Sequence, residues 1–185
     1  MDKNSLRHII LSKRNALSAQ EIREKSKAIH EKLLSLPEFL DARTVCLYMS
    51  FGSEVHTQEV IEHCFGRGKK VLIPAMAGSL GDLVPAEFLG FEKLKEAAFG
   101  IKEPFPVKEV PVEEIDLVIS PGVAFDEKLN RIGFGKGFYD KFLSKIPPRV
   151  PVIAIAFDLQ VLPEIPVEAH DKKMTKIITE RRIIG

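Results

Sequence analysis

Residues 45–73 read VCLYMSFGSEVHTQEVIEHCFGRGKKVLI and contain the clearest indication of the fold. Two short apolar runs, 45–49 and 71–73, have the length and composition of buried strands. Between them Thr57 can cap a helix, whose apolar residues follow at helical spacing: Val60, Ile61, Cys64 and Phe65. Gly66 and Gly68 are placed to end that helix. A strand, a helix and a second strand in succession predict two parallel strands joined by a right-handed crossover.

Helical and strand patterns alternate along the rest of the chain. Leu6, Ile9 and Ile10 have helical spacing, and Ser18-Ala-Gln-Glu21 is a capping box for a second helix. Further strands are expected at 83–88, 115–120, 152–156 and 176–179. Residues 75–106 are the least regular part, and the sequence assigns them no role. We expect one three-layer α/β domain over residues 1–185, with a mostly parallel sheet flanked by helices.

Composition excludes several classes of protein. The chain has 185 residues and a net charge of +1, which gives no argument for a nucleic-acid or membrane partner. The longest apolar stretch, 150–157, is far shorter than a membrane span, and the first residues lack the pattern of a signal peptide. Cys46 and Cys64 are expected to be buried free thiols, which favours a cytoplasmic location.

A glycine-rich segment, Asn130-Arg-Ile-Gly-Phe-Gly-Lys-Gly-Phe-Tyr-Asp140, is the strongest functional signal. Glycines at 133, 135 and 137 allow backbone N–H groups to converge on an anion, and a helix beginning after them adds partial positive charge. Arg131 and Lys136 bring full positive charges to the same place. The segment is therefore interpreted as a polyphosphate cradle.

The glycine spacing matches neither of two familiar nucleotide motifs. A Walker A loop requires Ser or Thr after the lysine, and Gly137 stands there. The dinucleotide motif needs its third glycine one residue later. A flexible turn between a strand and a helix is the alternative interpretation. The segment follows the expected strand 115–120 and Pro121-Gly122, and α/β proteins bind ligands beyond the carboxyl ends of such strands.

The sequence resembles the 5-formyltetrahydrofolate cyclo-ligases (methenyltetrahydrofolate synthetases) in four segments. The glycine-rich segment, preceded by Pro121-Gly-Val-Ala-Phe-Asp126, is similar to the signature of that family. The other three are Lys3-Asn-Ser-Leu-Arg7, Tyr48-Met-Ser-Phe-Gly-Ser-Glu-Val-His-Thr57 and Pro166-Val-Glu-Ala-His-Asp171. They occur in the same order as in the family and extend over most of the chain, so together they are far more specific than any one of them.

The resemblance implies that ATP contacts two segments. The first supplies Lys3, Asn4, Ser5, Leu6 and Arg7, and the second supplies Arg131, Ile132, Gly133, Phe134, Gly135, Lys136, Gly137, Phe138 and Tyr139. Lys3 and Arg7 share one helix face because they are four residues apart. Without the resemblance, a solvated face is the preferred interpretation of these two cations.

The resemblance also implies a site for the reduced folate, formed by Met49, Glu54, Phe134, Gly135, Lys136, Gly137 and Tyr139. Glu54 would accept hydrogen bonds from the pterin ring; alternatively, it is a carboxylate favoured by the dipole of the next helix. Met49, Phe51 and Phe134 would form apolar walls, although a phenylalanine is more typical of the core.

Asp140 and Asp171 are the candidate ligands for Mg²⁺, which binds one or two carboxylates together with phosphate oxygens. The alternative for Asp140 is a first-turn helix residue that satisfies backbone N–H groups. His170 is interpreted as structural.

The resemblance implies an enzyme that uses ATP and Mg²⁺ to cyclise 5-formyltetrahydrofolate to 5,10-methenyltetrahydrofolate. Tyr139, Lys136 and Arg131 are the catalytic candidates, while Phe138 is expected to face the core. Two alternatives remain: a protein like the sugar-phosphate isomerases or acyl-CoA transferases, and a nucleotide-binding module without catalysis. The expected partners are small molecules only, and a monomer is expected.

Overall fold

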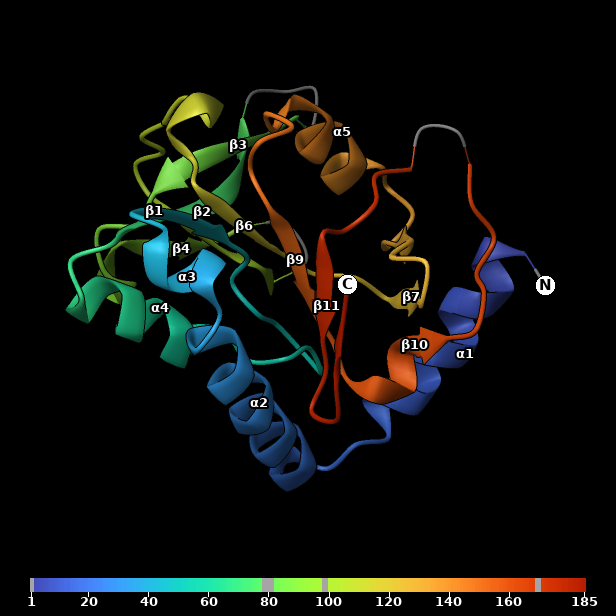
Figure 1. Cartoon of the computed structure of the whole chain (residues 1–185). Helices are drawn as coiled ribbons and strands as arrows, with labels where there is room; N and C mark the ends of the chain where they lie inside the picture. Colours follow the sequence, from blue (N-terminus) through green and yellow to red (C-terminus); the bar gives the residue numbers. More distant parts are fainter. Residues whose placement is uncertain (1, 78–81, 98–99, 169–170) are drawn as a thin grey trace.

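A seven-stranded sheet runs through the computed structural model, which describes residues 2–77, 82–97, 100–168 and 171–185 (Figure 1). Its strand order is β12-β11-β9-β6-β1-β2-β3. The strands are β1 (Thr44–Leu47), β2 (Lys70–Ala77), β3 (Asp82–Glu87), β6 (Leu117–Ser120), β9 (Val152–Ile155), β11 (Lys176–Ile178) and β12 (Ile183–Ile184).

The five inner strands are parallel, and each edge strand is antiparallel to its neighbour. β1 pairs in parallel with both β2 and β6, and the parallel pairing continues through β9 to β11. β3 and β12 close the two edges in the antiparallel sense. The mostly parallel sheet predicted from the sequence is confirmed. The strand expected at 83–88 exists as β3, which is joined to β2 as a hairpin rather than by a crossover helix.

Helices cover both faces of this sheet because alternate residues of each strand point to opposite sides. Val45 packs in a core with α2 (Ala19–Leu34), α3 (Pro37–Asp41) and α4 (Gln58–Gly66). Cys46, the next residue, packs on the other side with Phe142 and Leu143 of α5 (Phe138–Lys145). The three-layer arrangement expected from the sequence is therefore present.

The helix ends bear out one capping prediction and correct another. Ser18 and Glu21 form the expected capping box at the start of α2. Thr57 precedes α4, but its side chain makes no capping hydrogen bond. Its hydroxyl instead donates to the carbonyl oxygen of Tyr48 at 2.8 Å and accepts from the backbone N–H of Ser50 at 2.9 Å. Thr57 thus fastens the chain that leaves β1.

The first helix, α1 (Lys3–Asn15), lies apart from the other helices, against a second, smaller sheet (Figure 1). This sheet has the order β10-β7-β8, formed by Val161–Leu162, Ala124–Asp126 and Arg131–Ile132. Leu6 and Ile10 of α1 share a small core with residues of this sheet and its flanks: Val123, Ala124, Ile132 and Ile165. A two-stranded sheet, β4 (Leu94–Glu96) and β5 (Lys102–Pro104), completes the fold. The sequence predicted neither of the small sheets.

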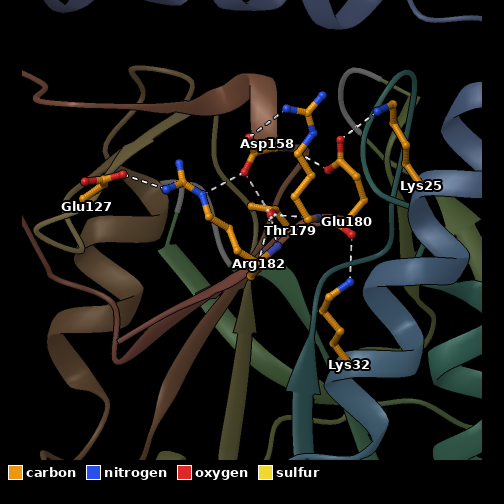
Figure 2. Close-up of polar contacts among 8 residues, drawn as sticks. Lys25, Lys32, Glu127, Asp158, Thr179, Glu180 and Arg182 are labelled. Atoms are coloured by element: carbon orange, nitrogen blue, oxygen red, sulfur yellow. Dashed lines mark hydrogen bonds and ion pairs between the residues drawn. The ribbon is translucent and has the colours of Figure 1, made fainter.

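Polar side chains fasten the turn between β11 and β12, as Figure 2 shows. Asp158 lies in the short helix η4 (Asp158–Gln160) beyond β9, and its carboxylate accepts hydrogen bonds from Thr179 and Arg182 at 3.1 Å each. Glu180 accepts from Lys25 of α2 at 2.7 Å, and its backbone oxygen accepts from Lys32 at 2.8 Å. We call this set the hairpin cluster: Lys25, Lys32, Glu127, Asp158, Thr179, Glu180, Arg181 and Arg182.

Both cysteines are buried free thiols, as expected. Burial raises the pKa of the Cys64 thiol to about 11 and that of Cys46 further still. Within the described part of the chain, no helix is long and apolar enough to cross a membrane.

Candidate active site

The order of strands in the large sheet reverses between β1 and β6. The crossover from β1 runs through α4 on one face, and the crossover that follows β6 runs through α5 on the other. In open α/β sheets ligands bind at such a switch point, beyond the carboxyl ends of the strands. A cavity of about 650 Å³ opens there, between Tyr48 and Met49 after β1 and Pro121 and Gly122 after β6.

The glycine-rich segment forms one wall of this cavity. Gly135 and Gly137 have φ angles of +92° and +71°, a region that side-chain-bearing residues rarely adopt. Gly137 precedes the first residue of α5, and the exposed residues 134–137 lie at the start of that eight-residue helix. Backbone N–H groups at a helix start carry partial positive charge. This geometry supports the anion site expected from the sequence, which stays a prediction.

Helix α1 contacts this wall directly. The Arg7 Nε donates to the carbonyl oxygen of Gly133 at 2.7 Å, and one of its terminal nitrogens donates to the side-chain oxygen of Asn4 at 2.5 Å. The Lys3 ammonium pairs with Asp171 at 2.7 Å and with Glu168 at 3.0 Å. Helix α1 and two residues far from it in the sequence, Glu168 and Asp171, thus meet beside the glycine-rich segment.

Arg131 is buried beneath that segment, with 3% of its surface exposed. Its guanidinium pairs with Asp140 at 2.5 Å, and its central carbon lies 5.8 Å from the centre of the Tyr139 ring. The Arg131 Nε is buried and has no hydrogen-bond partner in the described ranges. Arg131 therefore fixes the first turn of α5 while it also borders the cavity.

Tyr139 and Phe138 both line the cavity, but they differ in how they pack. The Tyr139 ring contacts the Phe142 ring edge to face at 6.0 Å and packs against the cores on both sides of the sheet. Burial raises the pKa of the Tyr139 hydroxyl well above its ordinary value. Phe138 belongs to neither of those cores. The expectation that Phe138 faces the core is therefore wrong, because Tyr139 has that packing.

Glu54 is a buried carboxyl group at the edge of the cavity, with 5% of its surface exposed. Burial raises its pKa to about 7, although the positive charge of Arg14 and a hydrogen bond from the Phe51 N–H act in the opposite direction. That hydrogen bond is 3.2 Å long. The group can therefore change its charge near neutral pH, which is typical of functional sites.

Aromatic side chains stand exposed at the rim. Phe51 and Phe134 are 36% and 45% exposed, and their ring centres lie 6.3 Å apart. Rings of this size are normally buried. With Met49 they offer apolar surface next to the polar glycine-rich wall.

Residues 75–106, to which the sequence assigned no role, supply a further wall of the cavity. The residues of this wall are Met76, Leu83, Ile101, Lys102 and Glu103. Glu103 accepts a hydrogen bond from the Met76 N–H at 3.2 Å, which connects β5 to β2. No periodic pattern marks the residues around β5, so only the tertiary structure reveals their position.

The cavity collects most of the candidates named from the sequence. Lys3, Asn4, Arg7, Met49, Glu54, residues 131–140 and Asp171 all line it. Two candidates do not: Leu6 is buried in the small core of α1, and the Ser5 hydroxyl is bonded to Asp2 at 3.0 Å. His170 lies outside the described residues.

Asp140 and Asp171, the two candidate metal ligands, border the same cavity but each is paired with a cation. Among the residues that the structure describes, no group of three or more His, Cys, Asp or Glu is arranged to hold a metal ion. Two carboxylates on one cavity still suit Mg²⁺, which takes its remaining ligands from phosphate and water.

Comparison with known proteins agrees with this geometry. The model of the 5-formyltetrahydrofolate cyclo-ligase family matches residues 1–180. A probable 5-formyltetrahydrofolate cyclo-ligase of Schizosaccharomyces pombe is 35% identical, with 100% of this chain and 98% of the relative covered. The 5-formyltetrahydrofolate cyclo-ligase of Escherichia coli K12 is 31% identical, with 95% and 98% covered.

Two solved structures have the same fold. The 5,10-methenyltetrahydrofolate synthetase of Aquifex aeolicus superposes with a TM-score of 0.89 at 32% identity, with 100% of this chain and 92% of that chain covered. The synthetase of Mycoplasma pneumoniae gives a TM-score of 0.80 at 26% identity, with 97% and 99% covered.

Proposed function

Because this chain belongs to the 5-formyltetrahydrofolate cyclo-ligase family, we propose that it converts 5-formyltetrahydrofolate to 5,10-methenyltetrahydrofolate with cleavage of ATP to ADP and phosphate. The single observation that supports this most strongly is the composition of the cavity at the switch point. One wall is a glycine-rich helix start with cations, and the facing surface is apolar with one buried carboxyl group, Glu54. A polyphosphate and a flat heterocycle need these two different surfaces side by side.

The phosphates of ATP are assigned to the glycine-rich side. Lys136 is exposed there and makes no ion pair with the other described residues, so its charge is available to a ligand. Lys3 and Arg7 approach from α1 and complete the positive surface. Phosphoryl transfer asks a protein mainly for alignment and for neutralisation of charge, and these groups supply both.

The reduced folate is assigned to the apolar side. Met49, Phe51 and Phe134 would enclose the pterin, and the Glu54 carboxylate would accept hydrogen bonds from its amino and N–H edge. This arrangement presents the formyl group of the substrate to the glycine-rich segment.

The reaction converts the formyl oxygen into a leaving group. This oxygen attacks the γ-phosphorus of ATP, a P–O bond forms, and ADP departs. N10 then attacks the formyl carbon and loses its proton, and the C–O bond breaks as phosphate leaves. Tyr139 borders the cavity beside the glycine-rich segment. Its hydroxyl is proposed to contact the transferring phosphoryl group or the formyl oxygen. Arg131 would act by holding Tyr139 and Asp140 in place.

Asp140 and Asp171 are proposed to hold Mg²⁺. Bound there, the ion would neutralise phosphate charge. Since Arg131 and Lys3 pair with these carboxylates, they compensate the acidic charge in its absence.

One assay tests the proposal. Purified protein, 5-formyltetrahydrofolate and Mg²⁺ are mixed with and without ATP, and the ultraviolet absorbance of methenyltetrahydrofolate is followed. Formation of product only with ATP is expected. ATP binding without turnover would instead support a nucleotide-binding module, and an absence of ATP binding would support an isomerase-like or transferase-like protein. Neither alternative is favoured by the relatives named above.

We further propose that the chain acts as one domain and as a monomer in the cytoplasm.

A further inference from the structure

Arg14 is a buried cation that lies behind the cavity and does not line it. It belongs to α1, and only 4% of its surface is exposed. No carboxylate of the described residues lies within ion-pair distance, and its Nε donates to the hydroxyl of Ser53 at 3.0 Å. A buried charge without an ion-pair partner is costly, so its position calls for an explanation.

Its contacts connect the two walls of the cavity. Ser53 belongs to the turn 51–54 after β1, and its hydroxyl in turn donates to Asn15 at 2.5 Å. The guanidinium carbon of Arg14 also lies 5.7 Å from the centre of the Phe134 ring, in the glycine-rich segment. One side chain of α1 therefore supports both the turn that carries Glu54 and the exposed aromatic ring.

We infer that Arg14 is a positioning residue of the folate site, which holds the turn 51–54 and the Phe134 ring and supplies the positive charge opposite Glu54. This inference rests on the proposed function, because it assigns to the pterin the two groups that Arg14 supports. A carboxylate that accepts hydrogen bonds from the pterin edge must be ionised, since a protonated carboxyl group turns one oxygen into a donor.

The groups that face Glu54 explain why Arg14 is needed for that ionisation. They are Arg14 from α1, Tyr48 after β1, Tyr139 from α5 and the Phe51 N–H. Both tyrosines have a pKa well above its ordinary value and remain neutral near pH 7. Arg14 is therefore the charged group that lowers the pKa of Glu54, which burial has raised to about 7.

The test compares Arg14→Met, which keeps an unbranched apolar chain but removes the charge, with Arg14→Lys, which keeps the charge. Lys13→Met, at the neighbouring exposed position, is the matched control. Binding of 5-formyltetrahydrofolate is measured by calorimetry without ATP between pH 6 and pH 9. Arg14→Met is expected to bind about fivefold more weakly near pH 7, since a rise of about one unit in the pKa of Glu54 from about 7 lowers its ionised fraction there from about one half to about one tenth. The loss should shrink towards pH 9, while ATP affinity stays unchanged.

Arg14→Lys should keep the wild-type pH midpoint, and Lys13→Met should match the wild type throughout. An Arg14→Met loss of equal size at every pH would overturn the inference, because Arg14 would then be only a packing residue. If Arg14→Met fails to fold, Arg14→Lys decides: a midpoint raised above that of the wild type overturns the inference.

A second readout separates this inference from the proposed function. The Glu54 carboxyl carbon is titrated by ¹³C NMR in the wild type and in the Arg14 variants, which requires no folate. A higher pKa of Glu54 in Arg14→Met supports the inference, and an unchanged pKa overturns it. A wild-type protein that fails to bind 5-formyltetrahydrofolate contradicts the proposed function, whatever the NMR result.

Discussion

The carboxyl ends of the parallel strands carry two groups of charged residues that differ in how completely they are paired. Beyond β9 and β11, the hairpin cluster satisfies its own charges (Figure 2). Asp158 accepts from Thr179 and Arg182, and Arg182 also reaches Glu127 at 2.7 Å. Among the described residues, each carboxylate of this cluster is paired with a cation of the same cluster, and none of its members lines the cavity.

Beyond β1 and β6 the pairing is incomplete. Glu54 and Arg14 are buried without an ion pair between them, the Arg131 Nε has no hydrogen-bond partner within the described ranges, and Lys136 stands exposed. The buried groups among these lower stability unless a ligand or a neighbouring charge compensates them. The comparison teaches that pairing within the protein stabilises one half of the edge, whereas the other half keeps its polar groups for binding.

The largest effect that we predict is a loss of kcat when the Tyr139 hydroxyl is removed from the incompletely paired half. Tyr139→Phe removes one oxygen and little packing, so the fold should survive. An interaction made mainly in the transition state lowers kcat and leaves substrate affinities nearly intact. We expect kcat to fall by about 10²-fold or more, the usual size of a lost acid–base or hydrogen-bonding group. A near-normal kcat in steady-state assays would reduce Tyr139 to a packing residue.

The unpaired cation should have the next largest effect. Lys136→Ala removes a charge that no described residue uses, so it should weaken ATP binding by roughly 10-fold to 100-fold through lost charge-assisted contacts. Folate affinity should change less. Lys25→Ala is the control, because Lys25 is already paired with Glu180 in the hairpin cluster. This variant should leave ATP affinity unchanged in nucleotide titrations. Unchanged ATP affinity in Lys136→Ala would show that the phosphates bind elsewhere.

Asp140 tests whether a paired carboxylate of the cavity also serves the metal. Asp140→Asn keeps the size but removes the charge, so the Mg²⁺ concentration needed for half-maximal turnover should rise about tenfold, because a hard cation loses one anionic ligand. Circular dichroism checks the fold, since Arg131 loses its partner. Wild-type magnesium dependence in a folded variant would leave Asp140 with only its role beside Arg131.

The sequence predicted those parts of the fold and of the site that have a pattern within a few consecutive residues. The crossover unit 45–73 and the glycine-rich segment carry periodicity or spacing within a few residues, and both appear where the sequence placed them. The β10-β7-β8 sheet consists of strands of two or three residues, too short for any periodic pattern. Its pairing comes from contacts between distant parts of the chain.

Arg14 shows a second limit of sequence reasoning. It follows Lys13 in a polar stretch, and arginine is normally an exposed residue. Only the tertiary structure shows that one of these two neighbouring cations is buried and the other exposed. The cavity wall formed by the residues around β5 was missed for a related reason, since loops owe their positions to the elements they pack against.

The cost of keeping Glu54 unpaired can be measured as a dependence of stability on pH. Burial raises its pKa from 4.5 to about 7, so the folded protein holds this proton more tightly than the unfolded chain. The free energy of unfolding of the wild type therefore decreases, because of this group, as the pH rises from 4.5 to 7. Above pH 7 the full destabilisation by the buried charged carboxylate is present. Glu54→Gln removes the titration and still offers an acceptor to the Phe51 N–H.

Urea unfolding should therefore find Glu54→Gln more stable than the wild type at pH 8, by up to about 3 kcal/mol, the linkage value of such a shift. This difference in stability should shrink towards pH 5. The Glu54→Gln variant should also bind folate more weakly than the wild type. A stability difference that is the same at both pH values would mean that Glu54 does not titrate in this range.

The smallest effect is expected in the hairpin cluster. Asp158 accepts from Thr179 and Arg182, and its backbone N–H donates to Glu180 at 2.8 Å, so it joins η4 to the turn between β11 and β12. Asp158→Asn keeps the shape and the backbone hydrogen bond but removes the charge opposite the partly exposed Arg182. Partly exposed pairs contribute little, so Tm should fall by only roughly 2–4 °C. Both KM values should remain those of the wild type, because every group involved lies outside the cavity wall. A changed KM for ATP or folate in this variant would break the distinction between the two halves of the edge.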